Sequence, residues 1–224
     1  MTDKICVSIG ASTSTKLKRD LIKAFKKSDY VELRLDFIEP SQIPDILNSI
    51  KDQLLRCICT LRPKSEGGKF SGTEKERISI LKLIAEFEPY LLDVEYNTLK
   101  NKELQRFLRI NKVNILVSWH DFSKTPSKKF LKNRVKKMSK FSKNIKIVTT
   151  ARTIEDTLRI LQLYRTKSNS INLVAFAMGD YGRMSRILCT RLGSPFTYVS
   201  LGKPIAPGQF SLAEMRSIFD LQKH

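Results

Sequence analysis

The sequence predicts an α/β fold, a single-domain (β/α)₈ TIM barrel that spans residues 1–224. Eight short apolar runs, each typical of a buried strand, recur along the chain. Amphipathic helical patterns separate them, and several of these patterns begin with capping residues. Eight strand-then-helix units in 224 residues fit a compact parallel barrel. An open doubly wound sheet is the rival, but Gly10-Ala11-Ser12 is a poor match to the glycine-rich turn that it needs.

The expected strands follow in chain order at 4–9, 30–35, 56–61, 90–95, 114–118, 145–149, 173–177 and 197–201. Helices are expected between them. Thr73-x-x-Glu76 and Ser211-x-x-Glu214 form capping boxes, and Thr153-x-x-Asp156 is a weaker relative of the same pattern. No linker, repeat or low-complexity segment interrupts the alternation, so we expect one domain.

The chain is strongly basic, with 41 lysine and arginine residues against 22 acidic residues and a formal net charge of +19. Such a balance suits a nucleic acid or a small anionic substrate. Ten of the basic residues lie between Lys124 and Lys146, where no acidic residue occurs. Apolar residues recur among them at helical spacing: Phe130, Leu131, Val135, Met138 and Phe141. We therefore expect the aromatic rings to be buried, the charges to cover a solvated helix face, and no nucleic-acid partner.

Neither a membrane nor a metal is expected. No hydrophobic run reaches the roughly 18 residues that a membrane helix needs. The N-terminal MTDKICVSIG also lacks a signal-peptide pattern. Cysteines occur at positions 6, 57, 59 and 189, without two pairs at metal-site spacing. These features favour small buried thiols and a cytoplasmic protein.

Charged residues gather where the expected strands end, which is where a parallel barrel carries its chemistry. In order they are Glu32, Arg34, Asp36, Arg62, Glu66, Asp93, Glu95, His120 and Lys146. Residues two apart share one face of a strand, so Glu32, Arg34 and Asp36 should all point to the interior. Buried charges persist only when paired. Both a functional site and a purely structural ionic layer satisfy this pattern.

Lys146 lies among Ile145, Ile147 and Val148. Apolar surroundings should lower the pKa of its amine from about 10.4 towards neutrality. An uncharged lysine amine is a nucleophile toward carbonyls and forms Schiff bases. His120, in SWHDF, could move protons at neutral pH. A snorkelling lysine and a structural histidine are the alternatives.

Seven segments, in order, resemble type I 3-dehydroquinate dehydratases of the shikimate pathway: VELRLD, TLRPKSEGGKF, DVEY, SWHDF, IKIV, MGDYGRMSR and APGQ. The match runs from Val31 to Gln209. The resemblance implies a (β/α)₈ barrel, a homodimer, and removal of water from the small molecule 3-dehydroquinate to give 3-dehydroshikimate. It implies neither a metal nor an organic cofactor.

The resemblance also implies a role for individual residues. Lys146 would be the Schiff-base lysine, His120 the group that removes and returns protons, and Glu66 the residue that orients and tunes His120. Arg186 would grip the substrate carboxylate, and Gln209 would reach the substrate from a closing loop. The other implied substrate-binding residues are Glu32, Arg34 and Arg62, with Ser8 and Ile205 as further candidates.

One position departs from the family pattern, because Ile205 stands where a serine or threonine usually precedes APGQ. The missing hydroxyl removes a hydrogen bond worth roughly 0.5–1.5 kcal/mol, or up to about 3 kcal/mol to a charged group. We therefore expect weaker binding of the carboxylate.

Two other functions remain open from the residues. A Schiff-base aldolase acting on a sugar phosphate would need backbone amides near the last two strands to bind the phosphate. Only Leu201-Gly202-Lys203-Pro204 could supply them, and Pro204 has no N–H to donate. A nucleic-acid-binding protein would need exposed aromatic rings among the basic residues.

Overall fold

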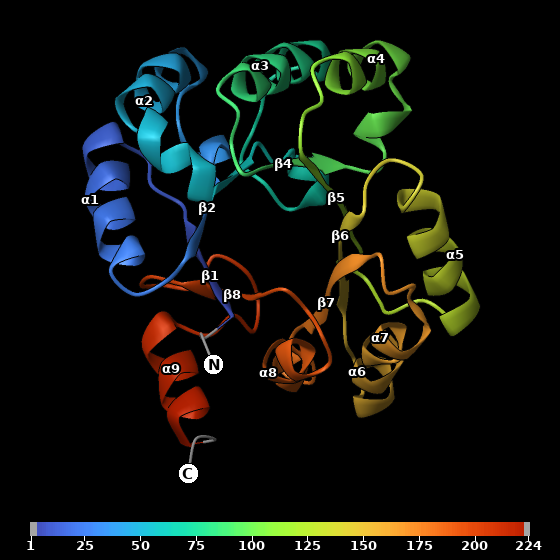
Figure 1. Ribbon diagram of the computed structural model, residues 1–224. Coiled ribbons are helices and arrows are strands. Elements are labelled where there is room, and N and C mark those ends of the chain that lie inside the picture. The colour runs from blue at the N-terminus through green and yellow to red at the C-terminus, as the bar shows by residue number, and fades with distance from the viewer. Residues whose placement is uncertain (1–3, 222–224) are drawn as a thin grey trace. The chain divides into compact units, whose positions relative to one another are not determined.

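The structure, a computed structural model, describes residues 4–221 (Figure 1). Its strands are β1 (Ile5–Ile9), β2 (Tyr30–Arg34), β3 (Cys57–Thr60), β4 (Leu91–Glu95), β5 (Ile115–His120), β6 (Asn144–Thr150), β7 (Asn172–Met178) and β8 (Thr197–Ser200). They form one sheet in the order β7-β6-β5-β4-β3-β2-β1-β8. The predicted (β/α)₈ barrel is confirmed, and every strand begins and ends within two residues of its expected position.

Helices alternate with the strands, as the sequence predicts. They are α1 (Ser14–Phe25), α2 (Ile43–Ser49), α3 (Glu74–Glu86), α4 (Lys102–Ile110), α5 (Lys128–Met138), α6 (Ile154–Leu161), α7 (Leu163–Thr166), α8 (Arg183–Arg191) and α9 (Leu212–Leu221). Short 3₁₀ turns at Leu35–Phe37 and Lys64–Glu66 follow β2 and β3.

Polar side chains start these helices in the expected way. The Thr73 hydroxyl accepts a hydrogen bond from the Glu76 N–H, and the Glu76 carboxylate accepts one from the Thr73 N–H. Ser211 and Glu214 make the same reciprocal pair before α9. At α6 the Thr153 hydroxyl accepts from the Asp156 N–H. Each cap satisfies an N–H group that the first turn of a helix leaves without an intrahelical partner.

By its internal contacts the chain divides into two compact units. The N-terminal unit comprises Ser8–Ser118, and the C-terminal unit comprises residues 4–7 and 119–221 of the described chain. In the N-terminal unit, α1 packs against β2 and α3 against β4 (Figure 1). In the C-terminal unit, α6 and α8 pack against β7, and α8 also packs against β8.

Strand registers decide which side chains meet. In the N-terminal unit, Thr60 of β3 lies beside Asp93 of β4, and Glu95 of β4 lies beside Ser118 of β5. In the C-terminal unit, β6 and β7 pair in parallel, with Lys146 opposite Val174. Because alternate residues share a face, Lys146 points to the same side of the sheet as the residues two and four positions further along β6.

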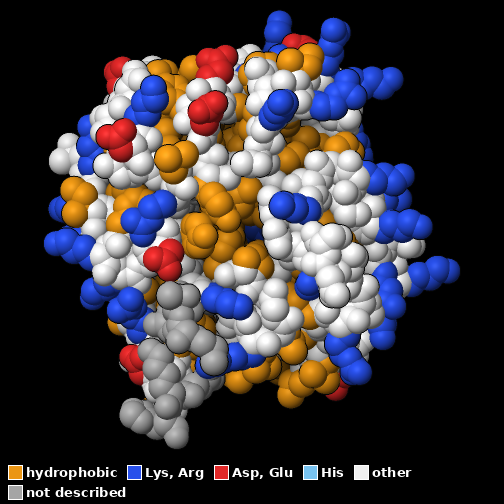
Figure 2. Space-filling model, viewed as in Figure 1, with side chains coloured by type: hydrophobic (Ala, Val, Ile, Leu, Met, Phe, Trp, Pro, Cys, Tyr) orange, Lys and Arg blue, Asp and Glu red, His pale blue; other side chains and the backbone are white. Residues whose placement is uncertain are grey.

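The basic helix α5 differs from its prediction in one respect. It buries Leu131, Val135 and Met138, and its lysines project along one edge of the molecule in Figure 2. Phe130, however, is 41% exposed, so the expectation that its ring is buried is wrong. Its ring lies at the border of the buried face, where it packs against Trp119 at 5.7 Å and receives the Arg134 guanidinium at 5.1 Å.

The structure also tests the expectations about membrane helices and cysteines. No helix within residues 4–221 is long and apolar enough to cross a membrane. The four cysteines are free and buried, as expected. Burial raises the pKa of the Cys57 thiol to about 12, so this thiol stays uncharged at neutral pH.

Candidate active site

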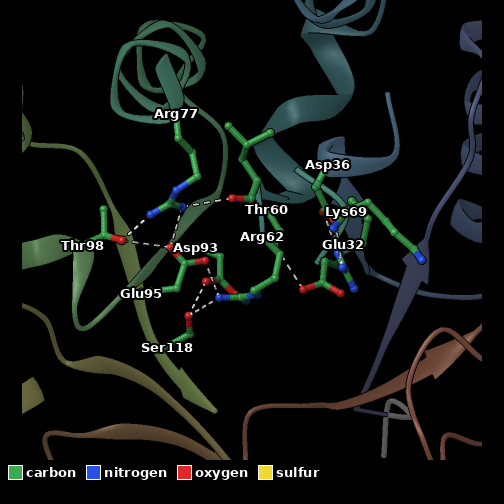
Figure 3. A network of polar contacts seen from close by, with 12 residues as sticks. Glu32, Asp36, Thr60, Arg62, Lys69, Arg77, Asp93, Glu95, Thr98 and Ser118 are labelled. Atoms are coloured by element: carbon green, nitrogen blue, oxygen red, sulfur yellow. Dashed lines mark hydrogen bonds and ion pairs between the residues drawn. The ribbon is translucent and has the colours of Figure 1, made fainter. Parts of the chain in front are cut away.

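Arg62 lies just beyond β3 and is the centre of a buried polar network in the N-terminal unit (Figure 3). Its guanidinium donates to Glu95 at 2.6 Å, to Ser118 at 2.7 Å and to Asp93 at 2.6 Å. Burial alone would lower the pKa of Arg62, but the carboxylates of Asp93 and Glu95 raise it instead. The guanidinium is therefore held charged and in one orientation.

A second buried arginine, Arg77 of α3, extends this network. Arg77 donates to the other oxygen of Glu95 at 2.7 Å, to the Leu61 carbonyl at 3.1 Å and to the Thr98 hydroxyl. Glu95 thus accepts from two arginines, which ties α3 to the ends of β3 and β4. The predicted pairing of interior charges is confirmed for this layer.

Glu32, Arg34 and Asp36 form a second group in the same unit. Glu32 is buried and accepts hydrogen bonds from Ser8 at 2.7 Å and from Thr60 at 3.1 Å. Arg34 makes a two-pronged ion pair with Asp36, with both N–O distances at 2.8 Å. The predicted interior position of Glu32 is confirmed, and Ser8 lies against its carboxylate.

Glu66 occupies the loop that connects β3 to α3. Glycine is required in this loop, because a side chain at Gly68 would meet the Arg62 carbonyl oxygen at 1.9 Å. Burial is the largest influence on Glu66, and with Glu95 and Asp93 it outweighs Arg62 and raises the pKa of Glu66 to about 7. A carboxyl group that titrates near neutrality is suited to exchanging or sharing a proton.

Glu66→Gln should change how stability depends on pH. Native Glu66 holds a proton between its unfolded pKa of about 4.3 and its native pKa of about 7, whereas the unfolded chain does not. The wild type therefore loses stability as pH rises through this range. The free energy of unfolding of the variant, relative to that of the wild type, should therefore rise by about 1–3 kcal/mol from pH 5 to pH 8. Urea unfolding of both proteins at the two pH values measures this change. An equal stability difference at both pH values would contradict the raised pKa.

Lys146 of β6 and His120, the last residue of β5, both belong to the C-terminal unit. Lys146 is 6% exposed in β6, and its amine lies 4.0 Å from the centre of the Tyr198 ring. His120 ends β5 and stacks on Phe122 with ring centres 6.1 Å apart. The Asp121 N–H donates to the Val148 carbonyl at 2.9 Å, which fixes the end of β5 beside β6. The expected burial of Lys146 is confirmed.

Arg186 of α8 is a buried cation that makes no ion pair with any described carboxylate. It is 1% exposed and stacks on Phe176 at 4.3 Å. One Nη donates to the Pro207 carbonyl at 3.1 Å, while Nε has no hydrogen-bond partner in the described chain. Burial lowers the pKa of Arg186 to about 10. A buried guanidinium of this kind is suited to binding an anion that has two acceptor oxygens.

The loop after β8 carries Ile205 and Gln209. Gln209 is buried, and its side-chain oxygen accepts a hydrogen bond from the Ile205 N–H at 2.9 Å. Gly208 adopts φ of 69°, and a side chain there would meet the Gly179 carbonyl at 2.8 Å. With the bond from Arg186 to Pro207, these contacts hold the loop against α8.

The candidate residues thus form two groups, each within one unit. The N-terminal unit contains Ser8, Glu32, Arg34, Arg62 and Glu66, and the C-terminal unit contains His120, Lys146, Arg186, Ile205 and Gln209. Residues 4–221 include no cluster of three or more histidine, cysteine or acidic side chains that could hold a metal ion.

Sequence reasoning missed Arg77, Ser118, Phe176 and Tyr198. The sequence does contain a sign that Arg77 is buried, because it stands four residues before Leu81 on the face of α3 that is otherwise apolar. Phe176 and Tyr198 show no such sign, since apolar and aromatic residues are ordinary in buried strands.

Comparisons with known proteins identify the family of this chain. A profile described as Type I 3-dehydroquinase matches residues 5–224. The 3-dehydroquinate dehydratase of Dehalococcoides mccartyi strain 195 is 40% identical over 203 residues, which cover 88% of this chain and 89% of that protein. The 3-dehydroquinate dehydratase of Methanocaldococcus jannaschii is 33% identical over 220 residues, which cover 97% of this chain and 98% of that protein.

Solved structures show the same architecture. The 3-dehydroquinate dehydratase of Aquifex aeolicus is 28% identical, with a TM-score of 0.79 over 97% of both chains. The enzyme from Geobacillus kaustophilus, at 22% identity, shares the fold with a TM-score of 0.87 over 99% of this chain and 91% of that one. From the match across nearly its whole length, together with its relatives above 30% identity, the chain belongs to the type I 3-dehydroquinase family.

Proposed function

We propose that this enzyme removes water from 3-dehydroquinate to give 3-dehydroshikimate, the third step of the shikimate pathway, through an imine on Lys146. The observation that carries the proposal is the buried amine of Lys146 in a member of this family. A lysine amine that has lost its proton attacks a carbonyl carbon and forms an imine.

The proposed chemistry balances with protein groups and water alone. The Lys146 amine adds to the ketone carbon, a proton from His120 helps the former ketone oxygen leave as water, and a protonated imine forms. His120 removes a proton from the adjacent carbon, and the electron pair moves towards the imine nitrogen. The hydroxyl on the next carbon then leaves as water with a proton from His120, which creates the carbon–carbon double bond. Hydrolysis of the imine returns the Lys146 amine and releases the unsaturated ketone.

Glu66 is assigned the role that the resemblance implies, which is to orient His120 and tune its protonation. This role is supported by the pKa of Glu66, which at about 7 lies in the range where histidine side chains titrate. The proposal assigns Arg186 to the substrate carboxylate, because this buried guanidinium has an unused Nε donor and makes no ion pair with a described carboxylate. Glu32, Arg34 and Arg62 are assigned to the ring hydroxyls and to the support of the site.

The direct test is a spectrophotometric assay on purified protein. Conversion of 3-dehydroquinate should produce the ultraviolet absorbance of a conjugated enone, at a rate proportional to enzyme concentration. A sugar phosphate offered as an aldolase substrate serves as the comparison. Cleavage of the sugar phosphate with no enone formed from 3-dehydroquinate would overturn the proposal.

Ile205→Ser should strengthen substrate binding. Ile205 is half-buried in the loop that Arg186 contacts through the Pro207 carbonyl, so a hydroxyl there can assist in binding the carboxylate. An extra hydrogen bond to a charged group is worth roughly 1.5–3 kcal/mol at most. We expect KM to fall severalfold with little change in kcat. A several-fold fall in kcat with KM unmoved would show that Ile205 instead packs to shape the loop.

We also propose that the enzyme is a homodimer that associates through α6 and α8. These helices contact one another, and they and the residue that follows α8 expose large apolar side chains: Ile154, Leu158, Met184, Leu188 and Leu192. An exposed apolar stripe of this kind suits a two-fold interface. Sedimentation of the wild type should give a dimer, and Leu188→Glu should give a folded monomer. A monomeric wild type at micromolar concentration would contradict this interface.

A further inference from the structure

We propose that Phe176 and Tyr198 form an aromatic seat that holds the Lys146 amine and the Arg186 guanidinium at a fixed separation. In this proposal the Tyr198 ring also stabilises the positive nitrogen of the Lys146 imine. The inference rests on the proposed function, which it extends by assigning two positioning residues and a basis for substrate selection.

The geometry of the seat lies entirely within the C-terminal unit. The Lys146 amine is 4.0 Å from the centre of the Tyr198 ring, and the Arg186 guanidinium carbon is 4.3 Å from the centre of the Phe176 ring. The two ring centres are 6.3 Å apart, with the planes tilted by 58°. Both nitrogen-bearing groups therefore lie within the roughly 6 Å over which a ring face attracts positive charge.

The surroundings make the seat rigid. Phe176 and Tyr198 are 2% and 3% exposed, and a third ring, Phe196, meets Tyr198 edge-on at 5.5 Å. The rings come from β7 and β8, the two ends of the strand order given for the sheet, so their contact joins those two strands (Figure 1). Close-packed buried rings have few alternative rotamers, so the cations that they carry have little freedom to move.

An aromatic ring is suited to these cations for a chemical reason. The nitrogen of Lys146 carries a positive charge in the protonated imine, and a ring face stabilises this charge without accepting a proton. At Arg186, stacking on Phe176 leaves the edge of the guanidinium available, and its Nε has no partner in the described chain. A carboxylate at that edge would compete with the substrate for the same hydrogen bonds.

The seat also predicts which ligands are accepted. An imine forms only if the ligand's ketone reaches Lys146 while its carboxylate binds Arg186. Because the two rings fix the separation of these groups, the site should select keto acids with one spacing between carbonyl and carboxylate. Small misplacements of reacting groups are costly in catalysis.

Three variants and one control test the seat. Tyr198→Leu removes the ring beside the imine nitrogen and should lower kcat on the order of 10- to 30-fold, with KM changed less than about threefold. Tyr198→Phe keeps the ring and should lose at most about threefold. Phe176→Leu should raise KM about tenfold and affect kcat less, because it loosens the carboxylate-binding Arg186.

The control removes a buried ring of the same unit outside the seat. Tyr164 of α7 is buried and its hydroxyl donates to the Ala175 carbonyl at 2.9 Å. Tyr164→Leu should lower the melting temperature while kcat per active site stays within about twofold of the wild type. Active sites are counted by mass spectrometry of the borohydride-trapped adduct.

A measurement without substrate separates the seat from the reaction. In protein carrying [ε-¹³C]lysine, the Lys146 resonance should be shifted upfield by the Tyr198 ring current. The shift should persist in Tyr198→Phe and disappear in Tyr198→Leu. If the shift is present but the wild type forms no adduct, the proposed function fails while the cation seat stands. An unshifted resonance, or equal losses of kcat in Tyr198→Phe and Tyr198→Leu, would overturn the seat.

Discussion

Lys146→Met should abolish turnover of 3-dehydroquinate. Methionine is unbranched, is one heavy atom shorter than lysine and suits the buried position in β6, where Lys146 is only 6% exposed, so the fold should be retained. Without an amine no imine forms, and the hydrogen next to the ketone loses its electron sink. Removal of a catalytic nucleophile costs on the order of 10⁴-fold or more in kcat.

The matched control is Lys143→Met, at an exposed position just before β6. It removes the same charge from a strand-flanking site and should keep kcat within about twofold of the wild type. Initial rates of enone formation and far-ultraviolet circular dichroism measure activity and folding side by side. Turnover by a folded Lys146→Met variant within tenfold of the wild type would rule out imine catalysis at this residue.

His120→Ala should lose about 10²- to 10⁴-fold in kcat, because one histidine serves several proton transfers. The adduct on Lys146 should still form, but slowly, since addition of the amine does not require the proton to be taken from carbon. Rapid-quench mass spectrometry can separate adduct formation from turnover.

Glu66→Ala is the comparison for this variant. Glu66 is assigned only to orienting and tuning His120, so its loss should be less damaging than loss of the imidazole. A larger fall in kcat for Glu66→Ala than for His120→Ala would show that the acid–base role belongs to the carboxyl group.

Much of the fold could be predicted because it depends on local patterns. Short β-branched runs such as Ile145–Thr149 identify strands by themselves, and the Thr73–Glu76 capping box marks the start of α3 within four residues of sequence. The position of Phe130 was predicted wrongly. Helical spacing places a residue on a face, but whether the border of that face is covered depends on a distant residue, here Trp119.

The candidate site could be predicted only in part. Alternation along β2 correctly placed Glu32 in the interior, because parity is a local property of a strand. It could not say that Arg62 is bound by Asp93, Glu95 and Ser118, since those partners come from β4 and β5 through strand register. The aromatic seat is beyond sequence reasoning for the same reason, because its rings and cations come from different elements.

The two other functions considered from the residues find little support. The chain's family is that of the 3-dehydroquinases, so an aldolase has no comparable basis. Phe130 is exposed among basic residues, as nucleic-acid binding would require, but its ring is already in contact with Trp119 and Arg134. A ring that already contacts side chains of its own protein has less surface free for stacking on a nucleobase.

Reductive trapping shows directly whether an imine forms on Lys146. Protein incubated with 3-dehydroquinate or 3-dehydroshikimate is treated with borohydride, which reduces an imine to a stable secondary amine, and peptides are then mapped by mass spectrometry. Imine formation on Lys146 predicts loss of activity and a mass increase of one reduced ligand on the peptide that contains this residue. Labelling of a different lysine, or full turnover with no labelled peptide, would contradict it.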